Sequence, residues 1–290
     1  MRTLLFSLLV ASSFIQAYAQ EPTKPCTVNF EVNAGPDIDV CESGTVGLNG
    51  LLGGDATRGV WRGGKGKFEP GRNAVQADYT PDSSEFGNTV VLTFVGDNPN
   101  FPDCPKGRDD IQVRVNVQPS VSAGESQRIC QGAPLSLKGK LTAGKAQRFL
   151  WTSSGAGTFD DASKPDAVYT PSSAGACRLT LKAFAFGVCL NDSDAIALTV
   201  IPVPVISLPE TLSSKGQEPV NLNAQVQGDA KISWTTSGNG KFQSSSKAIT
   251  TYTPSTDDLA AGTVTLTLKA KGEKDCNSTK STVLKLNPGE

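Results

Sequence analysis

The chain has 290 residues, with 27 Lys plus Arg, 28 Asp plus Glu and no His. The near balance of charge, with no charge block, indicates no binding to nucleic acid. The absence of His excludes Ser-His-Asp and Cys-His catalysis and the His-Glu-x-x-His zinc site.

The first 19 residues have the pattern of a secretory signal peptide. Arg2 precedes an apolar stretch over residues 4–15, and the small-x-small pattern of residues 17–19 predicts cleavage before Gln20. No later apolar run approaches the roughly 20 residues that span a bilayer. We therefore expect an exported chain that does not span the membrane and that lies in the periplasm, at the cell surface or in the medium.

The rest of the chain repeats one frame of residues three times. In each copy a Trp is followed by Gly-x-Gly-x-Phe, whose Phe lies seven or eight residues later, and by Tyr-Thr-Pro, which begins 18 residues after the Trp. The copies begin at Trp61, Trp151 and Trp234, which are 90 and 83 residues apart, the size of a small domain. We predict domains at residues 20–118, 119–204 and 205–290.

Alternation of apolar and polar residues predicts β-strands in every copy. The first copy has this pattern at residues 28–32, 46–48, 60–61, 75–79, 90–94 and 111–117. The second has it at 135–137, 150–151, 168–169, 177–181 and 196–200, and the third at 220–222, 232–234, 249–252, 264–268 and 283–286. Six or seven such strands are typical of an antiparallel β-sandwich, and the short proline-bearing links predict a semi-rigid, elongated row of three.

Seven cysteines in an exported chain are expected to be mostly oxidised. Cys41 and Cys130 lie just before the second strand of their repeats, and Cys104 and Cys189 lie before the last strand. These matching positions predict the bonds Cys41–Cys104 and Cys130–Cys189, one inside each of the first two sandwiches.

The other three cysteines have no partner in this scheme. Cys177 aligns with inward-facing positions and is expected to be a free thiol in the core. Cys26 and Cys276 lie at opposite ends of the chain, so a bond between them is not expected. Two interpretations stay open for this pair: both are unpaired, or they bond to another chain.

The repeated Trp residues have two interpretations. A Trp in a central strand usually plugs the core between two sheets, and this interpretation is favoured over an exposed aromatic platform for carbohydrate. The Tyr hydroxyls of the frame are expected to bond to backbone groups near their own turn.

Acidic residues form several small clusters, and none has the Asp-x-Asp-x-Asp-Gly spacing of a calcium loop. The clusters are residues 82–85, 109–110, 160–161, 192–194 and 257–258. The spacing favours solvated turns over metal sites. Because the acids differ in position between the repeats, we expect no glycosidase-type carboxylate pair, no cofactor and no enzymatic activity.

The segment 97–108, here called the tip loop, is longer than its copies in the other repeats. Phe101, flanked by Pro99 and Pro102, is an apolar residue in a polar loop. Two interpretations stay open: Phe101 contacts a protein partner, or it folds back over the disulfide at Cys104.

One family resemblance covers nearly all of residues 28–287. The runs 234–242, 251–255 and 259–268, with Cys276, resemble the PKD-like, immunoglobulin-like repeats of Bacteroidetes cell-surface and gliding-motility-associated proteins. The resemblance implies PKD-like sandwiches that serve as adhesive or spacer segments. Such proteins commonly end in a sorting domain for type IX secretion, and the residues after 287 do not resemble one. The resemblance therefore leaves export beyond the periplasm open.

These features predict an exported, non-enzymatic cell-envelope protein that acts as an adhesive or spacer module through contacts with other envelope or surface proteins. Two alternatives stay open. One is a carbohydrate-binding accessory protein that holds polysaccharide on exposed aromatic side chains. The other is a structural subunit of an envelope secretion or motility machine, in which an edge strand or the tip loop joins a partner's sheet.

Overall fold

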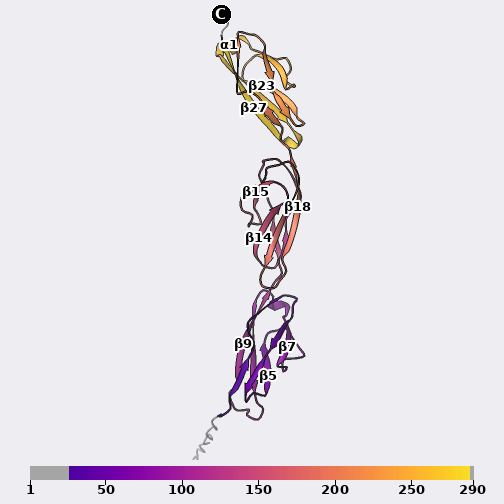
Figure 1. Ribbon diagram of the computed structural model, residues 1–290, viewed down its shortest axis with the longest axis vertical. Helices are drawn as coiled ribbons and strands as arrows, with labels where there is room; N and C mark the ends of the chain where they lie inside the picture. Colours follow the sequence, from indigo (N-terminus) through magenta and orange to yellow (C-terminus); the bar gives the residue numbers. More distant parts are fainter. Residues whose placement is uncertain (1–25, 288–290) are drawn as a thin grey trace, which may run out of the picture.

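The computed structural model describes residues 26–287, so the expected signal peptide at residues 1–19 lies outside the described residues. Three groups of strands follow one another along an elongated rod, from indigo at the first to yellow at the third (Figure 1). This is the expected all-β fold of three tandem immunoglobulin-like sandwiches. No helix within residues 26–287 has the length and apolar character needed to cross a membrane.

The first sandwich contains nine strands. They are β1 (Phe30–Asn33), β2 (Ile38–Cys41), β3 (Val46–Asn49), β4 (Leu51–Gly54), β5 (Arg58–Gly63), β6 (Lys67–Glu69), β7 (Gln76–Thr80), β8 (Thr89–Asp97) and β9 (Gly107–Asn116), with a 3-10 turn η1 (Ser83–Glu85). One sheet has the order β2-β9-β8-β5, the other has the order β3-β7-β6, and β1 pairs with β4. Of these pairs only β2 with β9 is parallel.

The second and third sandwiches repeat this order strand by strand. The second has β10 (Ser120–Ser122), β11 (Gln127–Cys130), β12 (Leu135–Ser136), β13 (Lys140–Ala143), β14 (Ala146–Ser153), β15 (Gly157–Phe159), β16 (Val168–Pro171), β17 (Gly175–Ala185) and β18 (Asp192–Ile201). The third has β19 (Val205–Ser207), β20 (Thr211–Lys215), β21 (Val220–Asn223), β22 (Gln225–Gln227), β23 (Lys231–Thr236), β24 (Lys241–Phe242), β25 (Ile249–Thr253), α1 (Thr256–Ala261), β26 (Thr263–Lys271), η2 (Glu273–Asp275) and β27 (Asn277–Asn287).

The alternation seen in the sequence decides which side chains enter each core. In β9, Ile111, Val113 and Val115 are at most 2% exposed, whereas the polar residues between them face water. Each sandwich builds a separate cluster of buried apolar residues in this way. Each sandwich therefore has a hydrophobic core of its own.

Each core contains the Trp of its repeat. Trp61, Trp151 and Trp234 are 0%, 2% and 3% exposed, which confirms the core interpretation. Each indole Nε1 donates to a backbone carbonyl oxygen: Trp61 to Val75 at 3.2 Å, Trp151 to Pro165 at 3.0 Å and Trp234 to Lys247 at 3.0 Å. The bond satisfies the one polar atom that each indole buries.

The disulfide pairing differs from the expected one. The bonds are Cys26–Cys104, Cys41–Cys189 and Cys130–Cys276. The predicted pairs Cys41–Cys104 and Cys130–Cys189 are therefore wrong, although all four residues are oxidised. Cys26 and Cys276 are neither unpaired nor bonded to another chain. Cys177 is free, as expected, and packs partly buried against the second core.

The parallel pairing of β2 with β9 explains the correction. Cys41 ends β2 and lies beside the end of β9, where the Glu42 amide donates to the Asn116 carbonyl at 2.9 Å. Cys104 precedes β9 and so lies at the opposite end of the sandwich. A disulfide needs Cα atoms within about 7 Å, so a Cys before the start of β9 cannot reach the Cys at the end of β2. Cys41 instead meets Cys189 of the second sandwich, and Cys104 meets Cys26, which precedes β1.

Candidate functional site

A tyrosine of the repeated frame holds the turn above each Trp. The Tyr79 hydroxyl accepts from the Gly66 amide at 3.2 Å and donates to a Glu85 carboxylate oxygen at 2.6 Å. In the third sandwich the Tyr252 hydroxyl donates to Asp258 at 2.7 Å. The expected bonds from tyrosine to nearby backbone are confirmed, whereas the buried carboxylates were not anticipated.

These carboxylates are fully engaged in the turn. Glu85 also accepts from the amides of Lys65 at 2.7 Å and Asp82 at 2.8 Å. Burial alone would raise the pKa of Glu85, but the hydrogen bonds from the Tyr79 hydroxyl and the two amides outweigh it and lower the pKa below its ordinary value. Burial, followed by the bond to Glu85, raises the pKa of Tyr79.

One signal in the sequence could have identified these acids. Both turns are capping boxes: an N-cap residue directly after Tyr-Thr-Pro is followed three positions later by the acid, as in Asp82 with Glu85 and Ser255 with Asp258. In the second sandwich Gly175 stands at the position of the acid. There the Tyr169 hydroxyl pairs with the Ser153 hydroxyl at 2.8 Å.

Other predicted acidic residues also serve the backbone. Asp109 accepts from the Ala34 amide at 2.7 Å, and Asp194 accepts from the Ala123 amide at 2.8 Å, the same contact in successive sandwiches. Among residues 26–287 no three Cys, Asp or Glu side chains lie together as metal ligands would.

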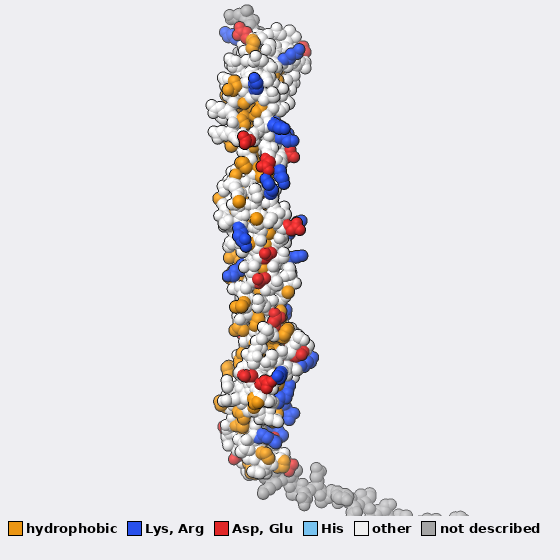
Figure 2. Space-filling model, turned by 90° about the vertical axis from the view of Figure 1, so that its right-hand side faces the viewer, with side chains coloured by type: hydrophobic (Ala, Val, Ile, Leu, Met, Phe, Trp, Pro, Cys, Tyr) orange, Lys and Arg blue, Asp and Glu red, His pale blue; other side chains and the backbone are white. Residues whose placement is uncertain are grey.

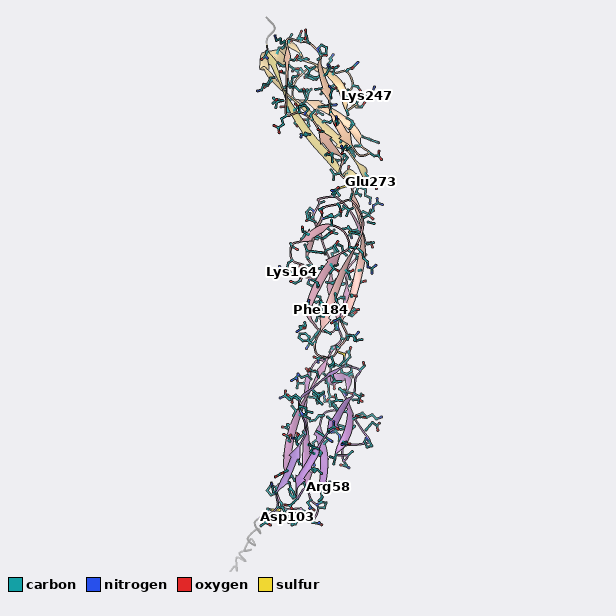
Figure 3. All side chains as sticks on the ribbon, viewed as in Figure 1. Arg58, Asp103, Lys164, Phe184, Lys247 and Glu273 are labelled. Atoms are coloured by element: carbon teal, nitrogen blue, oxygen red, sulfur yellow. A yellow bond between two sulfur atoms is a disulfide. The ribbon has the colours of Figure 1, made fainter. Side chains whose placement is uncertain are left out.

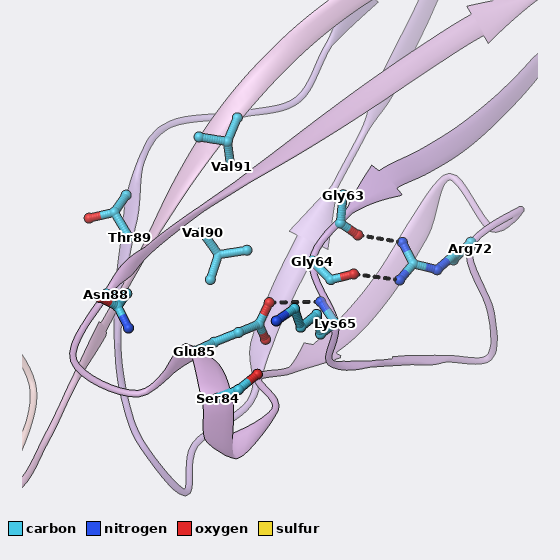
Figure 4. A pocket seen from close by; sticks show the side chains of 10 residues that line it. All are labelled: Gly63, Gly64, Lys65, Arg72, Ser84, Glu85, Asn88, Thr89, Val90 and Val91. Carbon is cyan, nitrogen blue, oxygen red and sulfur yellow. Dashed lines mark hydrogen bonds between the residues drawn. The ribbon is translucent and has the colours of Figure 1, made fainter.

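A hollow of about 580 Å³ opens on the surface of the first sandwich (Figure 4). The Arg72 guanidinium donates to the carbonyls of Gly63 at 2.6 Å and Gly64 at 3.0 Å, and Glu85 accepts from the Lys65 amide. Both charged groups thus stabilise the hairpin that forms the wall. The charged side chains that line the hollow therefore bond to the turn itself, and the hollow is a consequence of how this turn folds.

The tip loop begins at an ion-paired carboxylate. Asp97, only 12% exposed at its side chain, lies 2.8 Å from Arg58 and 2.7 Å from Lys106. The hydrogen bonds from Arg58 and then Lys106 lower the pKa of Asp97 to about 2. The neighbouring Asn98 side chain donates to the Asp55 carbonyl at 3.0 Å. These contacts fix the base of the tip loop.

Phe101 lies on the tip loop and is 42% exposed. Its amide donates to the Asn98 carbonyl at 2.9 Å and its carbonyl accepts from the Cys104 amide at 3.3 Å, so a turn tied to the Cys26–Cys104 bond presents the ring. Figure 3 places Asp103, two residues further on, at the lower extremity of the rod. The first sandwich therefore carries a partly exposed aromatic side chain at its outer end.

The first joint, where the first and second sandwiches meet, is crossed by a disulfide. Cys41 and Cys189 have Cα atoms 5.0 Å apart. The Lys145 ammonium of the second sandwich donates to the Gly87 carbonyl of the first at 3.1 Å. Phe186 contributes to a hollow of about 210 Å³ between the two sandwiches.

The second joint, between the second and third sandwiches, is built in the same way. Cys130 and Cys276 have Cα atoms 5.4 Å apart. Arg128 and Glu273 form an ion pair at 2.6 Å across this joint, and Figure 3 places Glu273 at the narrow point between the two sandwiches. A disulfide and a polar contact therefore occur together at both joints.

The surface of the rod carries mixed charge. On the face in Figure 2, Lys and Arg side chains and Asp and Glu side chains occur on all three sandwiches. Apolar side chains protrude at the first joint, where Phe186, Val188 and Leu190 flank Cys189 and are 41%, 62% and 72% exposed.

Solved structures of tandem domains are similar to this one at low sequence identity. An I-band fragment of titin has 15% identical residues and a TM-score of 0.49, over 91% of this chain and 99% of that chain. Extracellular domains 3–5 of Drosophila OTK have 11% identity and a TM-score of 0.33, over 92% and 99%. The insect immune protein hemolin has 10% identity and a TM-score of 0.35, over 90% and 76%. No protein-family model and no curated protein matches the sequence.

Proposed function

We propose that the chain is an exported, non-enzymatic cell-envelope protein that acts as a spacer or adhesive module through protein contacts. The observation that carries the proposal is the disulfide across each joint, because two extra covalent crossings hold three sandwiches in one row. A row of this kind separates whatever is bound at its two ends. Three disulfides also favour an oxidising compartment, as the signal-like segment at residues 1–19 does.

We further propose that the sandwiches are PKD-like repeats of the Bacteroidetes cell-surface and gliding-motility type, with boundaries at residues 20–118, 119–204 and 205–290. The repeated frame of Trp, Gly-x-Gly-x-Phe and Tyr-Thr-Pro supports the assignment to PKD-like repeats. The changes from β9 to β10 and from β18 to β19 fall next to the two proposed boundaries.

The proposed partner contact is Phe101 on the tip loop. A half-exposed aromatic ring can lose its remaining contact with water against a partner protein, and aromatic residues are enriched in such contacts. The tip loop also contains Asp103, which Figure 3 shows at the end of the rod, so a partner bound there would be held away from the opposite end.

A photo-crosslinking amino acid at position 101 tests this proposal in the native host. We expect an adduct with an envelope or surface protein in the membrane or surface fraction. The matched control is the same amino acid at Ile249, which is 68% exposed on the third sandwich. Equal labelling from both positions would contradict the proposal. So would the finding that this chain lies in the cytoplasm with its cysteines reduced.

The carbohydrate-binding alternative no longer has the repeated Trp residues as its platform, since all three are buried. It rests on Phe101 and Phe186 among the described residues, and binding to a glycan array that is lost in Phe101→Ala would support it. The machine-subunit alternative predicts instead that the protein co-purifies with secretion or motility components.

A further inference from the structure

Two strands lie side by side along each sandwich and point the same way. They are β2 with β9, β11 with β18, and β20 with β27, and all three pairs are parallel. In an otherwise antiparallel fold, these six strands run from the tip-loop end of the rod toward its other end (Figure 1).

At each joint, one strand of the pair continues through the chain and the other continues through a disulfide. At the first joint β9 leads by the chain into β10 and β11, whereas β2 ends at Cys41, which is bonded to Cys189 before β18. At the second joint β18 leads by the chain into β19 and β20, whereas β11 ends at Cys130, which is bonded to Cys276 directly before β27. Each joint therefore has two covalent crossings.

One covalent path runs the length of the rod, mostly through extended strands. It starts at the Cys26–Cys104 bond, follows β9, β10 and β11 to Cys130, crosses to Cys276 and follows β27 to Asn287. The path has 26 peptide steps from Cys104 to Cys130 and 11 from Cys276 to Asn287. At about 3.6 Å per step, these peptide steps span at most about 130 Å. The two disulfides on the path add Cα–Cα distances of 5.6 and 5.4 Å.

We propose that the oxidised protein bears tension between its two ends without extending beyond the length of this path. Without disulfides, the 261 steps from Cys26 to Asn287 would pull out to about 940 Å, roughly seven times the oxidised path. With the bonds intact, unfolding of a sandwich releases little length, because strands already rise about 3.3 Å per residue along the path. The rod therefore transmits a pull between its ends and cannot be stretched beyond the length of this path.

This inference deepens the proposed spacer function, on which its biological meaning rests. The mechanical property itself belongs to the isolated chain. A measurement on purified protein therefore tests the inference separately from location and partners, and either proposal can fail without the other.

Single-molecule stretching of the full chain, with handles at its two ends, provides the test. We expect the oxidised protein to gain less than about 130 Å of contour length on unfolding, and the protein in reductant to gain at least about 800 Å. A larger gain than about 130 Å without reductant would overturn the proposal.

Two matched double variants locate the path. Cys130→Ser with Cys276→Ser leaves as the shortest route the 15 steps from Cys26 to Cys41 and the 98 from Cys189 to Asn287. That route is 76 steps longer than the intact path, so this variant should extend about 270 Å further than the parent. Cys41→Ser with Cys189→Ser also removes one joint disulfide, but the path does not use it, so its final length should equal that of the parent.

If the two variants reach the same final stretched length, whether that of the parent or a greater one, the proposed path is contradicted. Loss of folding in a variant does not obscure the result, because the fully stretched length depends on covalent connections and not on folded structure.

Discussion

Residues of one type have different roles along this chain, according to what lies within a few ångströms of them. The three Trp side chains were placed in the core from their position in a central strand, and they are buried there. Glu85 and Asp258 were counted among solvated acids, yet they are buried under tyrosine hydroxyls. Only the capping-box spacing distinguishes these two acids from their exposed neighbours.

Glu85→Ala should destabilise the first sandwich. It leaves the Tyr79 hydroxyl and the amides of Lys65 and Asp82 without their buried acceptor, at a cost of about 1–3 kcal/mol. Urea unfolding followed by Trp fluorescence measures the loss. The control is Glu69→Ala, which removes only an exposed ion pair with Lys67 and should change the free energy of unfolding by less than about 0.5 kcal/mol. Equal losses would show that Glu85 has no special structural role.

Asp97 should contribute to stability in a pH-dependent way. Its pKa is lowered from 3.8 to about 2 by Arg58 and Lys106, so the contribution is complete above pH 4 and disappears as the pH falls toward 2. Asp97→Asn should therefore be less stable than the parent at pH 6, and the two unfolding curves should converge near pH 2. A difference that stays constant over this range would contradict the assignment.

At the level of elements, alternation predicted the longer strands well and the short ones poorly. The strands that carry Ile111 or Leu266 in their cores follow the expected period of two. Short edge strands such as β4 and β13 were not predicted, because four residues without a buried side chain among them show no such period. The pairing of β2 with β9 was also invisible, since the direction of pairing leaves no pattern along one strand.

The second glycine of each Gly-x-Gly has a packing role in the structure. Gly66 lies against the Tyr79 ring and the Thr80 carbonyl, where a Cβ atom would collide with both. Gly66→Ala should cost about 1–3 kcal/mol through overpacking. Gly47→Ala in β3 is the control, because its Cβ would meet nothing closer than 3.7 Å, and thermal unfolding should leave that variant near the parent.

The arrangement of the three sandwiches depends on the two joints, where sandwiches with separate cores meet. The ion pair of Arg128 with Glu273 is about half exposed, so it contributes at most about 1 kcal/mol to holding the second joint. The disulfides are covalent, and they limit the relative motion of the sandwiches far more strongly.

Reduction should therefore loosen the rod. We expect small-angle scattering to show a broader range of end-to-end distances in reductant, because each joint then keeps one peptide crossing. Cys26→Ser with Cys104→Ser is the control, since that bond crosses no joint, and its scattering should match the oxidised parent. Identical profiles for oxidised and reduced protein would mean that the peptide linkers alone set the shape.

Local pattern along the chain was sufficient for the all-β class, the three repeats, the buried Trp residues and the free Cys177, because each depends on periodicity or spacing that neighbouring residues share. The partners of the other six cysteines depended on tertiary structure. A disulfide requires proximity in space, and that proximity follows from two strands running parallel and from sandwiches meeting end to end. Matching positions in a repeat therefore identified four of the six bonded cysteines but gave them the wrong partners. The assembled rod decided that two of the three bonds join one sandwich to the next.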